Sequence, residues 1–129
     1  MKQPPLANAE LAVMNLLWDS EQLTARQVRE KLYPDASKAQ HGTVQRLLGR
    51  LEDKGFVTRD RSMATHLFKA AIPRRTYAGR QLESLAGRLT EGSIAPLITH
   101  LVEEKKISRS EIDEIKSILS DLDGGGSDD

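Results

Sequence analysis

In the first half of the chain, three short segments have apolar residues at the spacing of an α-helix. These segments cover about residues 8–18, 24–33 and 41–54. Asn8 and Thr24 are residue types that cap helix N-termini, and Gly55 stands where a helix C-terminus favours a positive φ. Three short helices joined by tight turns form a helix-turn-helix, so the third segment is the predicted recognition helix.

A change of period after the third segment predicts a β-hairpin. Residues 56–59 and 65–69 have strand character, and the polar residues 60–64 connect them. A hairpin directly after the third helix is the wing of a winged helix-turn-helix. We therefore expect residues 1–72 to form a winged helix-turn-helix DNA-binding domain.

The second half of the chain returns to helical periodicity. Ala78, Leu82, Leu85 and Leu89 lie close to a heptad spacing, and a shorter apolar pattern follows over about 94–104. Ser108 and Glu111 have the spacing of a capping box, which predicts a last helix as far as Leu122. The fold class is therefore expected to be mainly α with a small β-hairpin wing. The expected C-terminal parts are a helical dimerisation domain over 73–123 and a disordered tail over 124–129.

The aliphatic stripe of the second half must be covered, because about 45 residues are marginal for an independent core. Folding back onto the first domain would give a monomer. Packing against a second copy would give a two-fold homodimer, which is the commonest oligomer. We favour the homodimer, since a helix-turn-helix usually binds two half-sites. The residues expected at the dimer interface are Leu82, Leu85, Leu89, Leu97, Leu101, Ile112, Ile115, Ile118 and Leu119.

Charge is unevenly distributed, although 19 basic and 19 acidic residues make the net charge zero. Residues 1–80 carry 14 basic and 8 acidic residues, whereas residues 81–129 carry 5 and 11. The basic excess in the first half suggests a polyanionic partner. On charge alone, two ordinary solvated surfaces remain the alternative.

The third helical segment has the polar side chains of a DNA-reading helix. With its apolar stripe inward, Arg46 points outward, where it can contact guanine, and Gln45 beside it can contact adenine. Phosphate contacts are expected from the basic residues around it and on the wing. The predicted DNA-binding residues are Lys38, His41, Thr43, Gln45, Arg46, Arg50, Arg59 and Arg61. The alternative is that these arginines form a solvated face.

Several other functions are not expected from the composition. The chain has no cysteine, and its three histidines lack the spacing of a metal-binding pair, so no metal site or other cofactor is predicted. No phosphate-binding glycine loop or nucleophile motif is present, so we do not expect an enzyme. No apolar run reaches the roughly 20 residues of a membrane helix, and the first residues lack a secretory pattern. We therefore expect no membrane partner and a cytoplasmic location.

Three separated blocks of the sequence resemble the BlaI/MecI/CopY penicillinase-repressor family. They are LAVMNLLW at 11–18, TVQRLLGRLEDKGF at 43–56, and the stretch from Leu101 to Leu119. The resemblance covers about residues 8–122. It implies a winged-helix repressor that binds double-stranded DNA at a dyad operator as a homodimer, and it places Thr43 and Gln45 in the recognition helix. Arg46 departs from the family, which often has a small polar residue there.

The resemblance also implies a form of regulation. Penicillin-responsive members are inactivated by proteolysis at an Asn–Phe bond in the C-terminal domain, and the aligned bond here is His100–Leu101. A regulatory protease is thus a possible partner. Copper-responsive members use C-terminal cysteines, which this chain lacks.

Two other functions compete with the repressor. A winged-helix module that binds protein would have an apolar outer face on the third helix, and the polar residues there argue against it. A small-molecule-responsive regulator would need a pocket between the two halves, for which the sequence offers no ligand anchor.

Overall fold

The computed structural model describes residues 5–35 and 39–126. It divides the chain into an N-terminal unit, Met1–Leu82, and a C-terminal unit, Glu83–Asp129. The elements in chain order are α1 (Asn8–Trp18), α2 (Ala25–Leu32), α3 (Ala39–Asp53), β1 (Val57–Asp60), β2 (Leu67–Ala70), α4 (Arg74–Leu89), α5 (Ala95–Glu103) and α6 (Arg109–Gly126). The predicted fold class, mainly α with a small β-hairpin, is confirmed.

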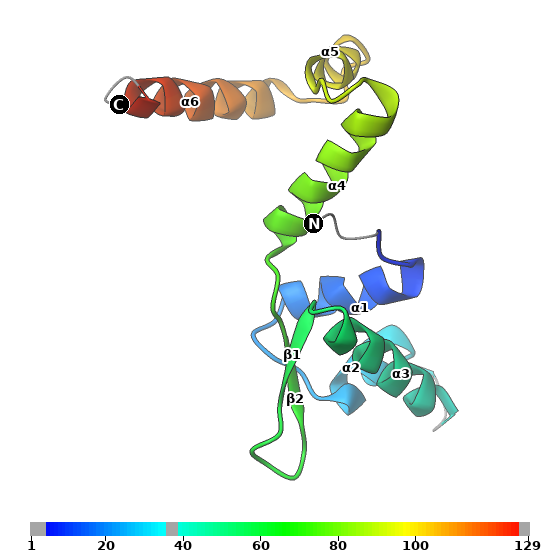
Figure 1. Cartoon of the computed structure of the whole chain (residues 1–129). Helices are drawn as coiled ribbons and strands as arrows, with labels where there is room; N and C mark the ends of the chain where they lie inside the picture. Colours follow the sequence, from blue (N-terminus) through cyan, green and yellow to red (C-terminus); the bar gives the residue numbers. More distant parts are fainter. Residues whose placement is uncertain (1–4, 36–38, 127–129) are drawn as a thin grey trace. The chain divides into compact units, whose positions relative to one another are not determined.

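The N-terminal unit packs α1, α2 and α3 around one apolar core, with the hairpin against them (Figure 1). The predicted apolar stripe of α3 is buried in this core, and Phe56 and Phe68 are its largest fully buried side chains. Gly55 follows α3 with a φ of 84°, as expected at a helix C-terminus. The core therefore fixes which face of α3 remains outside.

The helix caps of this unit match the sequence prediction in one case and differ in another. Thr24 caps α2, since its Oγ1 accepts from Gln27 N at 3.1 Å and Gln27 Oε1 accepts from Thr24 N at 2.8 Å. The predicted cap Asn8 was wrong, because Asn8 is the first residue of α1 and Ala7 is the cap. Glu10 Oε1 accepts from Ala7 N at 3.0 Å, so a side chain inside the helix satisfies the cap N–H.

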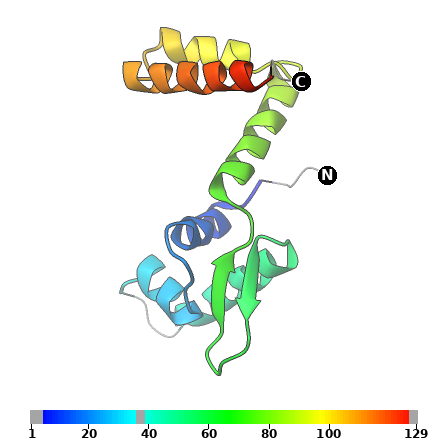
Figure 2. The same ribbon diagram turned by 90° about the vertical axis from the view of Figure 1, so that its left-hand side faces the viewer.

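The wing is an antiparallel hairpin in which Val57 pairs with Ala70 and Asp60 with Leu67 (Figure 2). A backbone bridge extends it, since Leu23 exchanges two hydrogen bonds with Phe68, at 2.9 and 2.8 Å. The sequence pattern does not indicate this bridge. It ties the segment just before the N-cap of α2 to the wing and so fixes the distance between α2 and β2.

The first turn of α4 is held against α1. Trp18 Nε1 donates to Ile72 O at 2.8 Å, and the Arg74 guanidinium lies 5.3 Å from the Trp18 ring centre. Arg74 also forms an ion pair of 3.0 Å with Asp19. Tyr77 is buried and meets the Phe56 ring edge-on at 5.6 Å. These contacts make the beginning of α4 a part of the N-terminal unit.

The C-terminal unit contains the end of α4, α5 and α6. The predicted capping box begins α6, because Glu111 N donates to Ser108 Oγ and Ser108 N donates to Glu111 Oε1, both at 3.1 Å. Among the described residues of this unit, Ala86 is the one buried apolar side chain. Large apolar side chains of all three helices are therefore exposed, and they include Leu85, Leu89, Leu101, Val102, Ile115, Ile118, Leu119 and Leu122.

The predicted domain limits at residues 72 and 123 stay predictions. Helix α6 continues to Gly126, three residues into the segment expected to be a disordered tail, and 127–129 lie outside the described residues. Across the part of the chain that the structure describes, no helix is both long and apolar enough to cross a membrane.

Candidate nucleic-acid interface

The outer face of α3 carries polar side chains around a small central surface. Gln45 and Arg46 are exposed, and Thr43 beside them is half-buried. Gly49 lies one turn further along, and a Cβ placed on it would meet nothing within 4 Å. This part of α3 therefore combines hydrogen-bonding groups with open space, which is what a helix needs to approach the edges of base pairs.

Two side-chain contacts arrange the first half of α3. Gln45 Nε2 lies 3.1 Å from His41 Nε2, and Arg46 donates a long hydrogen bond of 3.5 Å to Thr43 Oγ1. Both contacts are exposed, so they break at little cost when a ligand offers better partners. The structure thus brings four of the predicted DNA-binding residues onto the first half of one helix.

Arg50 lies further along α3 and is held by a carboxylate of α1. The Glu10 side chain is only 4% exposed, and its Oε2 lies 2.8 Å from Lys54 Nζ and 3.6 Å from Arg50 Nε. The Lys54 hydrogen bond is the main reason that the pKa of Glu10 is lowered, although burial acts in the opposite direction. Glu10 therefore locks the end of α3 onto α1 and partly neutralises Arg50, whose side chain stays 59% exposed.

The two wing arginines share one carboxylate of α3. Glu52 Oε1 lies 3.2 Å from Arg59 and Glu52 Oε2 lies 3.0 Å from Arg61. Arg59 is only 18% exposed and its guanidinium lies 4.7 Å from the Phe68 ring centre, whereas Arg61 is 56% exposed. Both arginines were predicted to contact DNA. Arg59 mainly connects α3 to the wing through its ion pair, whereas Arg61 is the one that reaches solvent.

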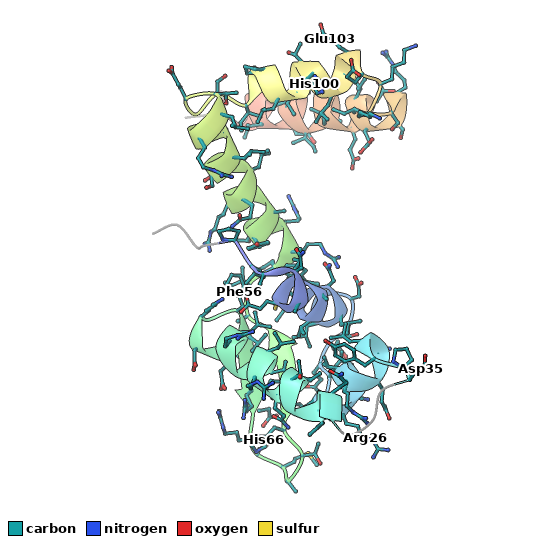
Figure 3. The ribbon with its side chains drawn as sticks, turned by 90° about the vertical axis from the view of Figure 1, so that its right-hand side faces the viewer. Arg26, Asp35, Phe56, His66, His100 and Glu103 are labelled. Carbon is teal, nitrogen blue, oxygen red and sulfur yellow. The ribbon has the colours of Figure 1, made fainter. Side chains whose placement is uncertain are left out.

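A hollow of about 280 Å³ lies between the start of α2, the first half of α3 and the loop end of the wing. Arg26 of α2 and His66 of the wing lie at this end of the N-terminal unit, away from Phe56 (Figure 3). The residues that line the hollow are Thr24, Ala25, Arg26, His41, Gln45, Arg59, Ala64, Thr65, His66 and Phe68. This site is not evident from the sequence, because its residues come from three separate segments.

The remaining predicted site residues are distributed as follows. Lys38 lies outside the described residues. Of the nine residues expected at a dimer interface, Leu97 and Ile112 are half-buried and the others are exposed. His100 and Leu101, at the bond aligned with the family's cleavage site, are both exposed within α5. Within the described part of the chain, no cluster of side chains has the composition of a metal site.

Comparison with known proteins finds repressors of one family. The penicillinase repressor family model matches residues 6–121. The methicillin resistance regulatory protein MecI of Mammaliicoccus sciuri is 23% identical over 115 residues, which are 89% of this chain and 93% of that protein. The penicillinase repressor of Staphylococcus aureus is 23% identical over 123 residues, 94% of this chain and 95% of that protein. The solution structure of the DNA-binding domain of the repressor BlaI aligns with 60% of this chain and 94% of its own, at 25% identity and a TM-score of 0.47.

Proposed function

This chain belongs to the penicillinase repressor family and is a DNA-binding transcriptional repressor, and we propose that it acts as a homodimer on a dyad operator. The observation that carries the proposal is the outer face of α3, where Gln45 and Arg46 are exposed beside the open surface of Gly49. Repression is steric: the bound dimer occupies an operator that overlaps a promoter and blocks the polymerase.

The proposed docking places α3 in the major groove. Arg46 offers two parallel donors to guanine, and Gln45 can exchange two hydrogen bonds with adenine. Thr43 lies where it can donate to a phosphate or contact a thymine methyl. Arg61 is the more exposed wing cation and reaches the backbone beside the groove. Since operator DNA is the target, we place the protein in the cytoplasm.

The proposed dimer is supported by the apolar surface of the C-terminal unit. Leu89, Ile118 and Leu122 are 66%, 59% and 68% exposed. A surface that carries many large aliphatic side chains is typical of a protein–protein interface. Burying them against the same helices of a second copy would remove this surface from water. Two linked α3 helices would then read two half-sites separated by about one helical turn or a multiple of it.

The proposal is tested by comparing Arg46→Ala with Lys38→Ala on two duplexes. One duplex is the fragment upstream of the protein's own gene, and the other has random sequence. Arg46→Ala should weaken the upstream complex by roughly 1–3 kcal/mol and leave random binding nearly unchanged. Lys38→Ala should weaken both about equally, as expected for a phosphate contact. Equal losses on both duplexes for both variants would remove the base-reading role of Arg46.

We further propose that a regulatory protease relieves repression by cutting the His100–Leu101 bond. Both residues are exposed, but the bond lies inside α5, so this nine-residue helix must open locally before a protease can bind it. Incubation of the full chain with the candidate protease should give fragments 1–100 and 101–129 by mass spectrometry. Cleavage only at other bonds would overturn the assignment.

A further inference from the structure

The hollow between α2, α3 and the wing has the chemistry of an anion site. Its lining contains the donors Arg26, His41, Arg59 and His66, together with the hydroxyls of Thr24 and Thr65, and it contains no aspartate or glutamate. Four groups that are cationic or become cationic on protonation therefore face one small volume. An anion in this volume would be favoured both by hydrogen bonds and by charge.

Nearby carboxylates neutralise the positive charge of the lining only in part. Arg59 is paired with Glu52 at 3.2 Å, and Arg26 lies 3.3 Å from Glu30 in an exposed pair on one turn of α2. Asp60 is close enough to His66 and to Lys69 to interact electrostatically with both. Exposed pairs such as Arg26–Glu30 are weak, so Arg26 exchanges its partner readily. His41 contacts the neutral Gln45 side chain.

We propose that this hollow binds one phosphate of the DNA backbone, with Arg26 and His66 as contacts, and that protonation of His41 and His66 strengthens the binding. The proposal rests on the proposed function, because it uses the docking of α3. The hollow opens beside His41 and Gln45, so a phosphate flanking the major groove would lie next to the base-reading residues.

Proton linkage follows from the two histidines. Histidine changes its charge between about pH 5 and 8, and the protonated ring donates from both nitrogens. A phosphate near both rings binds more tightly to the protonated protein. By linkage, affinity for any duplex should therefore rise as the pH falls from about 8 to about 6. The other charged groups that face the hollow or its lining are Arg26 and Arg59 on the basic side, and Asp60, Glu30 and Glu52 on the acidic side.

The test is a titration of the full chain against a random duplex of about 30 bp and the upstream fragment, read by fluorescence anisotropy at several salt concentrations and at two pH values. His66→Gln and Arg26→Ala should each weaken binding to both duplexes by about three- to tenfold near pH 6. Each should also make the negative slope of log K against log salt shallower, by at most the value of about 0.9 that belongs to one phosphate. His66→Gln should remove much of the pH dependence, and His41→Gln/His66→Gln should remove nearly all of it.

Lys31→Ala is the matched control, because Lys31 is an exposed cation at the other end of α2 and does not line the hollow. It should change the salt slope much less than Arg26→Ala. Circular dichroism of each variant verifies the fold. If the unmodified protein binds neither duplex, the proposed function fails. If it binds and the hollow variants keep its affinity, salt slope and pH dependence, only the phosphate site is overturned.

A titration with inorganic phosphate distinguishes a site for the DNA backbone from a site for a free phosphate ion. Added at millimolar concentrations, it should compete weakly with the duplex and shift the His66 ring resonances in NMR spectra. If phosphate shifts these resonances while His66→Gln and Arg26→Ala leave duplex affinity unchanged, the hollow binds a free anion. That outcome would overturn the assignment to the DNA backbone.

Discussion

The Tyr77 hydroxyl accepts a hydrogen bond of 2.8 Å from the Leu6 backbone N–H, and both residues are buried. The bond joins the segment before α1 to the first turns of α4, 71 residues later in the chain. A buried backbone N–H that loses its partner is costly. This contact therefore helps to keep the beginning of α4 attached to the rest of the N-terminal unit.

Tyr77→Phe should lower the free energy of unfolding by about 1–3 kcal/mol. It removes the hydroxyl that accepts from the buried Leu6 N–H, and it keeps the contacts of the ring. Urea denaturation followed by circular dichroism measures the change. Tyr33→Phe is the matched control, since Tyr33 packs half-buried against the same core, and it should change stability by less than about 0.5 kcal/mol. Equal effects of the two variants would show that the Leu6 bond adds nothing.

Glu10→Gln should destabilise the N-terminal unit by about 1–3 kcal/mol at neutral pH, because it removes the charge paired with Lys54 and Arg50. The pKa of Glu10 is lowered from its ordinary value of 4.5. Its stabilising effect is therefore complete above about pH 4.5 and is lost as the pH falls through the lower folded-state value.

Thermal unfolding of the protein and of Glu10→Gln, measured from neutral to acidic pH, should thus give curves that converge below about pH 4.5. Glu30→Gln serves as control, because Glu30 is 53% exposed and pairs with Arg26 on the surface. It should have little effect at any pH. A difference for Glu10→Gln that persists unchanged in acid would contradict the ionic explanation.

Gly49→Ala should separate stability from DNA binding. A Cβ at Gly49 meets nothing within 4 Å, so alanine should stabilise α3 by about 0.5–1 kcal/mol. If α3 enters the major groove, the added methyl group should also weaken duplex binding. Gly79→Ala in α4 is the control, because its Cβ is equally unobstructed and should bring stability without loss of affinity. Unchanged DNA affinity of Gly49→Ala would argue against close approach at this position.

Ile118→Glu should shift a dimer toward monomer, because Ile118 is 59% exposed on α6 and the change places a charge on the proposed interface. Light scattering coupled to size exclusion measures the mass of each variant. Ser117→Glu adds the same charge at the preceding, exposed position of α6 and should leave the mass unchanged. A monomeric unmodified protein would contradict the proposed dimer directly.

The helices and the wing could be predicted because their signals are local. Apolar spacing determined which face of α3 is buried, and the types of residues 24 and 108 identified two caps. The cap of α1 was not predictable in the same way. Asn8 is a good capping residue, but Glu10 satisfies the Ala7 N–H from inside the helix and leaves Asn8 in its first turn.

The number of charged residues at the site could be predicted from the sequence, but their ion-pair partners could not. The sequence places ten basic residues between 38 and 80, but it does not show that Glu10 reaches Lys54, 44 residues away. Nor does it show that Glu52 turns toward the wing and takes Arg59 out of solvent. The hollow was missed for the same reason, since Arg26, His41 and His66 meet only after the hairpin has folded.

The Glu52 carboxylate competes with DNA phosphates for the arginines of the wing. When Arg61 moves to a phosphate, it must leave an oxygen 3.0 Å away, so part of the attraction to the polyanion only replaces an attraction already present. Added salt screens both partners of this exchange. The tip of the wing should therefore depend less on ionic strength than its two arginines alone would suggest, and the protein's sensitivity to salt should arise mainly at α3 and the hollow.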